Sequence, residues 1–173
     1  AVEKMPNVVY VSLSGTESIN HDVVFSDAYK AAQSVMGEFF RLGHRQIAYV
    51  GEKRREMRYA GYRDFMQEQR LKEISVDAEQ TMNGGYTGME TLLCAGEQFT
   101  GVFCANDEAA MGAIKALRGH GKEVPRDVSV ISVDDIDVAS YFSPMLTTVH
   151  IPINELGRQA ARVLVDRISN ARK

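Results

Sequence analysis

Two patterns of apolar residues alternate along this chain. In the first, short runs of apolar and β-branched residues are bounded by polar residues, as in buried strands. In the second, apolar residues recur every three or four positions, as on one face of a helix. The first pattern predicts strands at Val8–Leu13, Gln46–Val50, Ser75–Met82 (a weak pattern), Thr100–Ala105 and Val128–Val133. The second predicts helices from Asp27 to Gly43, from Met57 to Gln69, from the loop at Asn83–Gly85 to Cys94, from Asp107 to Gly119, and onward from Asn154.

This alternation of predicted strands and helices, with short connections between them, is typical of βαβ units. Such units build a parallel sheet that is covered by helices on both faces. The fold class predicted from the pattern is therefore α/β. No internal repeat and no low-complexity linker interrupts the alternation.

Polar residues follow three of the predicted strands. They are Glu52 with Arg58, Asn106 with Asp107, and Asp134 with Asp135. In a parallel sheet the carboxyl ends of the strands lie along one edge, which is where ligands bind in open α/β sheets. Carboxylate and amide oxygens accept hydrogen bonds from hydroxyl groups, and a guanidinium donates several. This set of side chains therefore suits a neutral, polyhydroxylated ligand.

Each of these residues also has an alternative role that is purely structural. We expect Asp107 to cap the helix that it begins, and Asp135 to cap the short segment after its strand in the same way. Arg58 could be a solvated helix residue paired with a neighbouring glutamate. Asp134 is the hardest to explain by structure alone, because an acid directly after a buried strand needs a partner.

Composition and charge narrow the classes of protein further. The net charge is −3 and the lysines and arginines are scattered, which argues against nucleic-acid binding by this segment. No apolar run is long enough to cross a membrane, and the amino-terminal residues lack the features of a signal peptide. We expect Cys94 and Cys104 to be buried, reduced thiols, which fits a cytoplasmic protein.

We find no catalytic machinery in the sequence. It contains no phosphate-binding glycine loop, no nucleophile elbow and no Cys/His spacing for a metal. Asp134 and Asp135 would point apart on an extended chain, so they are poor candidates for a paired acid and base. His44 and His150 have no nucleophile at a recognisable spacing. We therefore expect no enzyme activity, no cofactor and no metal.

Four segments resemble the lactose/galactose-repressor (LacI/GalR) family of bacterial transcription regulators, in the order and spacing of that family. They are Leu42–Val50, Arg58–Tyr62, Cys104–Leu117 and Val124–Ile168. The resemblance implies a periplasmic-binding-protein-like core of type I, in which two α/β lobes enclose a small-molecule effector. It also implies a homodimer whose affinity for operator DNA changes when the effector binds.

The resemblance further assigns the parts of the chain. It places residues 44–148 in the carboxyl-terminal lobe, and residues 1–43 with 149–173 in an amino-terminal lobe that is only partly present. The DNA-binding headpiece is expected to be absent, as is the final strand of the family. Operator DNA would then be contacted only through a headpiece outside this chain, and no membrane contact is expected.

Individual residues receive roles from the same resemblance. The expected effector contacts are Arg58, Asn106, Asp134, Asp107, Asp27, Tyr29 and Asn83. The expected hinge residues are Pro144, Thr147, Thr148, His150 and Pro152, of which Pro152 also matches a position of effector contact. Ser132 and Asn83 depart from the family pattern, since they stand where the family often has a glycine and a stacking aromatic residue.

The sequence thus predicts the effector-binding domain of a LacI-family regulator, with Arg58 and Asp134 as the main polar clamps on a sugar or glycoside. The alternative is a transport-associated periplasmic sugar-binding protein of the same fold. A helix-turn-helix upstream of the chain would indicate the first, and a signal peptide the second.

Overall fold

The computed structural model describes residues 8–13, 21–54 and 56–170. The chain divides into two compact units. The larger is formed by Tyr29–His150, and the smaller by residues from both ends of the chain, up to Ala28 and from Ile151 onward. Among the described residues, no helix has both the length and the apolar character that crossing a membrane requires.

The larger unit contains a parallel sheet of five strands in the order β4-β3-β5-β6-β7. The strands are β3 (Ile47–Gly51), β4 (Ile74–Asp77), β5 (Gly101–Cys104), β6 (Ser129–Asp134) and β7 (Thr147–His150). The helices are α1 (Ala28–Arg41), α2 (Met57–Glu68), α3 (Met82–Cys94), α4 (Asp107–Gly119) and the short 3-10 helix η2 (Asp137–Tyr141). The predicted α/β class with a parallel sheet is confirmed.

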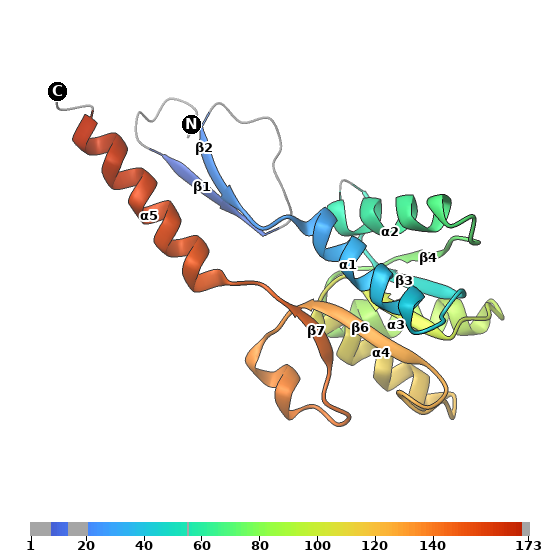
Figure 1. The fold of residues 1–173 in the computed structure, drawn as a ribbon. Coiled ribbons are helices and arrows are strands. Elements are labelled where there is room, and N and C mark those ends of the chain that lie inside the picture. Colours follow the sequence, from blue (N-terminus) through green and yellow to red (C-terminus); the bar gives the residue numbers. More distant parts are fainter. Residues whose placement is uncertain (1–7, 14–20, 55, 171–173) are drawn as a thin grey trace. The chain divides into compact units, whose positions relative to one another are not determined.

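Helices cover both faces of this sheet, with α1 and α2 on one side and α3 and α4 on the other (Figure 1). Toward α2, the ring of Tyr49 lies 5.3 Å from that of Tyr62 and 5.5 Å from that of Phe103. The next residue along β3, Val50, faces the other way, into the core that β3 and β5 share with α3 and α4. Because both of their faces are buried, the central strands β3, β5 and β6 are largely apolar, which is why they were visible in the sequence.

The start of α3 corrects the predicted loop at Asn83–Gly85, since these residues form the first turn of the helix. Thr81 caps the helix by accepting a hydrogen bond from Gly84 N at 3.0 Å. A Cβ atom on Gly85 would lie 2.0 Å from Ala109 O, so the glycine lets the backbones of α3 and α4 approach closely. Glycine is a poor helix former in isolation, and the packing against α4 overrides that preference.

The position of α1 differs from the predicted division of the chain, which placed residues 1–43 in the other lobe. Phe39 of α1 lies directly over Gly101 of β5, where a Cβ atom would come within 2.9 Å of its ring. Gln33 Nε2 donates a hydrogen bond of 2.7 Å to Gly61 O of α2. These contacts place α1 in the larger unit, so that the boundaries between the units fall at Tyr29 and His150.

The smaller unit pairs β1 (Val9–Ser12) with β2 (Asp22–Phe25) in parallel, and α5 (Ile153–Asn170) packs against both strands. Arg167 of α5 forms an ion pair with Asp22 of β2. The strand pattern at Val8–Leu13 is confirmed by β1. β2 was not predicted, because its short apolar run lies directly before the residues that were assigned to the helix from Asp27.

Candidate functional site

The carboxyl ends of β3, β5 and β6 lie side by side, as the sequence predicted. Val50 is in register with Cys104, and Phe103 with Ile131, so the residues that follow these strands emerge along one edge of the sheet. The polar side chains after the three strands therefore come close together there. We call this the carboxyl edge.

Arg58 lies at the centre of the carboxyl edge and is only 4% exposed. Its Nη1 donates hydrogen bonds to Ala105 O at 2.6 Å and to Gln80 Oε1 at 3.2 Å. Its Nη2 lies 3.7 Å from Asp134 Oδ1, so an ion pair joins the first turn of α2 to the end of β6. The alternative of a solvated Arg58 is therefore wrong.

Two residues that the sequence analysis did not select hold Arg58 in place. Glu56 is buried and caps α2, since its Oε1 accepts a hydrogen bond from Arg58 N at 3.1 Å. Its Oε2 accepts from Gln80 Nε2 at 3.1 Å. Glutamate is not one of the usual N-capping residues, so the sequence contained no clear signal for this role. Gln80 was hidden as well, because it lay inside the predicted strand at Ser75–Met82, whereas β4 ends at Asp77.

Asn106, and not Asp107, caps α4, so the predicted capping residue is wrong by one position. Asn106 Oδ1 accepts a hydrogen bond from Ala109 N at 3.0 Å, and its Nδ2 donates to Gln80 O at 3.0 Å. Both ends of this amide are thus engaged within the protein. Asn106 and Arg58 both donate hydrogen bonds to Gln80, which places the two side chains near each other at the carboxyl edge.

Asp107 is completely buried and accepts three hydrogen bonds. Its Oδ1 accepts from the hydroxyl groups of Ser132 and Thr148, both at 2.6 Å, and its Oδ2 accepts from Ile136 N at 2.8 Å. Burial of an ionised carboxylate is costly unless it is hydrogen-bonded, and these three donors meet that need. With no exposed surface, Asp107 does not present its carboxylate to a ligand.

Asp134 ends β6 with its side chain partly exposed beside Arg58. Burial raises the pKa of its carboxyl, the Arg58 guanidinium opposes that shift, and the charges of Asp107 and Glu56 add to it. Its backbone φ is 124°, and that of Asp135 is 57°. Few residues other than glycine adopt such angles.

Asp135 does not cap the segment after the strand, contrary to expectation. The residue at the cap of η2 is Ile136, which makes no side-chain capping bond. Asp135 N instead donates to Thr148 Oγ1 at 3.2 Å, and its Oδ2 lies 2.8 Å from His150 Nδ1. The turn after β6 is therefore tied to the neighbouring strand β7.

The remaining expected effector contacts differ in their exposure to solvent. Tyr29 donates a hydrogen bond to Asp64 Oδ2 at 3.2 Å. Asp27 and Pro152 are exposed, and Asn83 is exposed in the first turn of α3. Of the expected hinge residues, Thr147, Thr148 and His150 form β7, and Pro144 precedes it.

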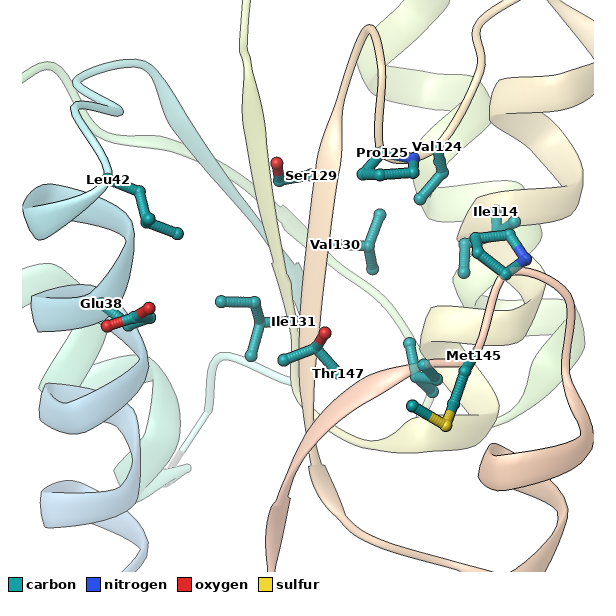
Figure 2. A pocket seen from close by; sticks show the side chains of 12 residues that line it. Glu38, Leu42, Ile114, Val124, Pro125, Ser129, Val130, Ile131, Met145 and Thr147 are labelled. Atoms are coloured by element: carbon teal, nitrogen blue, oxygen red, sulfur yellow. The ribbon is translucent and has the colours of Figure 1, made fainter.

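Among the cavities outside the carboxyl edge, two are lined in part by α4. The first, of about 250 Å³, is lined by the first residues of β6 and β7, Ser129 and Thr147, and so lies at the opposite end of these strands. Figure 2 shows Glu38 and Leu42 of α1 across from Ile131 in this cavity. The second, of about 870 Å³, is a groove between α3, α4 and η2. Its lining is Met82, Asn83, Tyr86, Met111, Gly112, Lys115, Arg118, Val138 and Phe142.

Comparison with known proteins identifies relatives of one kind. Residues 36–173 match the family described as periplasmic binding protein-like domain. The chain is 37% identical to the HTH-type transcriptional regulator RegA of Clostridium saccharobutylicum over 147 residues, which are 80% of this chain and 44% of that protein. The chain spans about half the length of the curated relatives that it matches.

Solved structures agree with these relatives. A LacI-family transcriptional regulator from Enterococcus faecium with bound ribose has a TM-score of 0.82 and 31% identity, over 93% of this chain and 62% of that one. A sugar-binding LacI-family regulator from Escherichia coli, complexed with phosphate, has a TM-score of 0.82 and 29% identity, over 91% of this chain and 59% of that one.

Proposed function

This chain belongs to the periplasmic binding protein-like domain family, in its LacI-type branch of regulators, and we propose that it senses a neutral sugar or glycoside at the carboxyl edge. The observation that carries this proposal is the Arg58–Asp134 pair. Its two side chains come from α2 and the end of β6, and they meet where three parallel strands end. Sites of this kind bind ligands in open α/β sheets.

The arrangement around Arg58 supports a ligand that is held in a fixed orientation. Ala105 O and Gln80 accept hydrogen bonds from the guanidinium, and Glu56 accepts one from the backbone N of Arg58, so the side chain is fixed before any ligand arrives. A side chain that is already ordered loses little conformational freedom on binding, so more of its interaction energy appears as affinity. The partly exposed Asp134 can accept hydrogen bonds from ligand hydroxyl groups, while Arg58 donates to ligand oxygens.

The balance of charge supports a neutral ligand. The Arg58 guanidinium already faces two carboxylates, with Asp134 Oδ1 at 3.7 Å from Nη2 and Glu56 Oε1 at 3.9 Å from Nε. An anionic ligand would compete with Asp134 for the same cation and would be repelled by the acids around it. A hydroxyl group meets neither cost.

For the whole protein, we propose a homodimeric regulator whose affinity for operator DNA depends on the effector. Operator contact would be made by a headpiece outside this chain. The effector would act by binding one conformation of the protein more tightly than another. The relationship to RegA favours this regulator over a transport-associated binding protein of the same fold.

We propose the groove between α3, α4 and η2 as the surface at which two copies meet. Apolar side chains remain exposed there, including Met82 at 51% and Val138 at 45%. A contiguous exposed apolar surface with polar residues at its rim is typical of protein–protein contacts. The family resemblance supplies the partner, which is a second copy of the chain.

The proposed ligand class can be tested by thermal denaturation of the full-length protein with a panel of ligands. The panel contains D-ribose, other mono- and disaccharides, sugar phosphates and purines. A ligand that binds only the folded state raises the melting temperature in proportion to its occupancy. We expect a neutral sugar to stabilise the protein. If only purines or phosphorylated compounds do so, the proposal is wrong.

The clamp residues can be tested with the sugar that emerges from this panel. Asp134→Ala removes the acceptor, and Arg58→Lys keeps the charge but loses the planar fork of donors. Each is expected to weaken binding by about 1.5–3 kcal/mol, the value of a hydrogen bond to a charged group. The control is Asp137→Ala, an exposed acid three residues along the chain, which should bind as the unaltered protein does. Unchanged affinity in Asp134→Ala would exclude the clamp.

A further inference from the structure

We propose that Asp107 is a positioning residue that holds the turn after β6 against β7 through Thr148, and so sets the orientation of Asp134. The part of this proposal that concerns ligand affinity rests on the proposed function, because it takes Asp134 to be the effector clamp. The part that concerns the turn does not. The resemblance had suggested Asp107 as a ligand contact, and its complete burial leads to a different role.

The three hydrogen bonds of Asp107 join segments that are distant in the sequence. Ser132 belongs to β6, Ile136 to the turn that follows it, and Thr148 to β7. Asp107 itself begins α4, which packs against β6. One carboxylate therefore connects a helix, two adjacent strands and the turn that carries the proposed clamp.

The backbone of this turn explains why it needs such support. Asp134 has a φ of 124° and Asp135 a φ of 57°, and neither is glycine. Residues other than glycine rarely adopt such conformations and keep them only where the surroundings hold them. The two amides that follow Asp134 are both held, because Asp135 N donates to Thr148 Oγ1 and Ile136 N donates to Asp107 Oδ2.

Thr148 is the residue through which this support reaches β7. Its hydroxyl donates to Asp107 and accepts from Asp135 N, so it takes part in both restraints. It lies two residues before His150, the last residue of the larger unit, which pairs in register with Asp134. A displacement of Asp134 by a ligand would therefore be transmitted to the strand by which the chain leaves this unit.

The affinity of the full-length protein for D-ribose, measured by calorimetry, tests the link to the ligand. Thr148→Val removes the hydroxyl at nearly constant volume and should weaken binding about tenfold, because the orientation of Asp134 is no longer held. Thr148→Ser keeps the hydroxyl and should restore binding. Ser132→Ala is the matched control. It removes a bond of the same length to the same oxygen, and it should lower the melting temperature while leaving Kd unchanged.

A double-mutant cycle separates positioning from general destabilisation. If Thr148 acts through Asp134, Thr148→Val should have no further effect on Kd once Asp134→Asn has removed the charged clamp. Additive effects of the two substitutions would overturn the proposal. Equal losses of affinity in Thr148→Val and Ser132→Ala would also overturn it, because they would indicate only a loss of stability.

Hydrogen exchange in the ligand-free protein tests the turn without any ligand. We expect Thr148→Val to accelerate amide exchange at Ile136 as well as at Asp135, because the whole turn is released. Unchanged exchange at Ile136 would overturn the proposal. If D-ribose does not bind the unaltered protein, that choice of ligand fails, and hydrogen exchange still decides the role of Asp107 and Thr148.

Discussion

At the scale of single residues, Asp134 is held in a state that is unfavourable in the ligand-free protein. Its backbone lies at a φ of 124°, and burial raises the pKa of its carboxyl above 3.8 in spite of the neighbouring Arg58. Residues with perturbed pKa values and strained backbone cluster at functional sites, where they lower the stability of the fold but serve binding. Asp134 therefore fits a ligand clamp better than a structural acid.

This state of Asp134 predicts a stabilising substitution. A carboxyl whose pKa is higher in the folded state binds its proton more tightly there than in the unfolded chain, so the ionised form destabilises the fold. This cost is absent well below pH 3.8 and grows as the pH rises through the raised pKa. Asp134→Asn cannot ionise, and we expect it to be more stable than the unaltered protein at pH 7.

Urea denaturation between pH 3 and 7 measures this effect. The difference in the free energy of unfolding between Asp134→Asn and the unaltered protein should shrink as the pH falls toward 3.8. The exposed Asp137→Asn serves as the control and should show no such trend. An Asp134→Asn variant that is less stable at pH 7 would mean that the pair with Arg58 outweighs the cost of burial.

At the scale of elements, α1 to α4 end in the same way. After each helix, one backbone amide bonds to the carbonyl five residues earlier, as in His44 N to Phe39 O and Leu71 N to Met66 O. The residue before that amide adopts a left-handed conformation, which glycine adopts without strain. It is glycine after three of these helices and Arg70, with a φ of 55°, after α2.

Arg70 therefore offers a simple test of this ending. Arg70 is exposed, and we expect Arg70→Gly to raise the free energy of unfolding by about 0.5–1 kcal/mol, because glycine relieves the unfavourable φ. The matched control is Gly96→Ala after α3. Its φ is 72° and nothing lies within 4 Å of the added Cβ atom, so only the backbone is strained and stability should fall. Urea midpoints that move in the same direction would contradict this interpretation.

At the scale of the whole molecule, the groove between α3, α4 and η2 is the surface at which we propose that two copies meet. Val138 is 45% exposed at this groove, and Lys115 and Arg118 line it as well. A charge placed in an apolar contact must be desolvated when the partner binds, which weakens association. An added cation would also be repelled by the two that are already present.

We therefore expect Val138→Lys to convert the proposed dimer of the full-length protein into monomers. Light scattering coupled to size-exclusion chromatography measures this change. Leu42→Lys replaces another exposed apolar side chain, at the end of α1 and outside the groove, and should leave the dimer intact. If both variants remain dimeric, the two copies meet at another surface.

The sequence by itself determined the central strands of the larger unit and the edge at which its polar side chains gather. The strands β3, β5 and β6 are buried on both faces, so their apolar runs were visible without any knowledge of their neighbours. Parallel strands joined by helices must end along one edge, so the meeting of Arg58 with Asp134 followed from the order of the elements.

Tertiary structure decided what depends on contacts between residues distant in the sequence. The backbone of α4 turns the loop predicted at Asn83–Gly85 into helix, and Phe39 over Gly101 assigns α1 to the larger unit. Asp107 is a buried acceptor and not a cap, because the fold brings Ser132, Ile136 and Thr148 beside it as donors. The local sequence pattern thus predicts which segments form helices and strands, because helix and strand propensities and the spacing of apolar residues are properties of short segments. The role of each polar side chain depends on which donors and acceptors the fold brings to it.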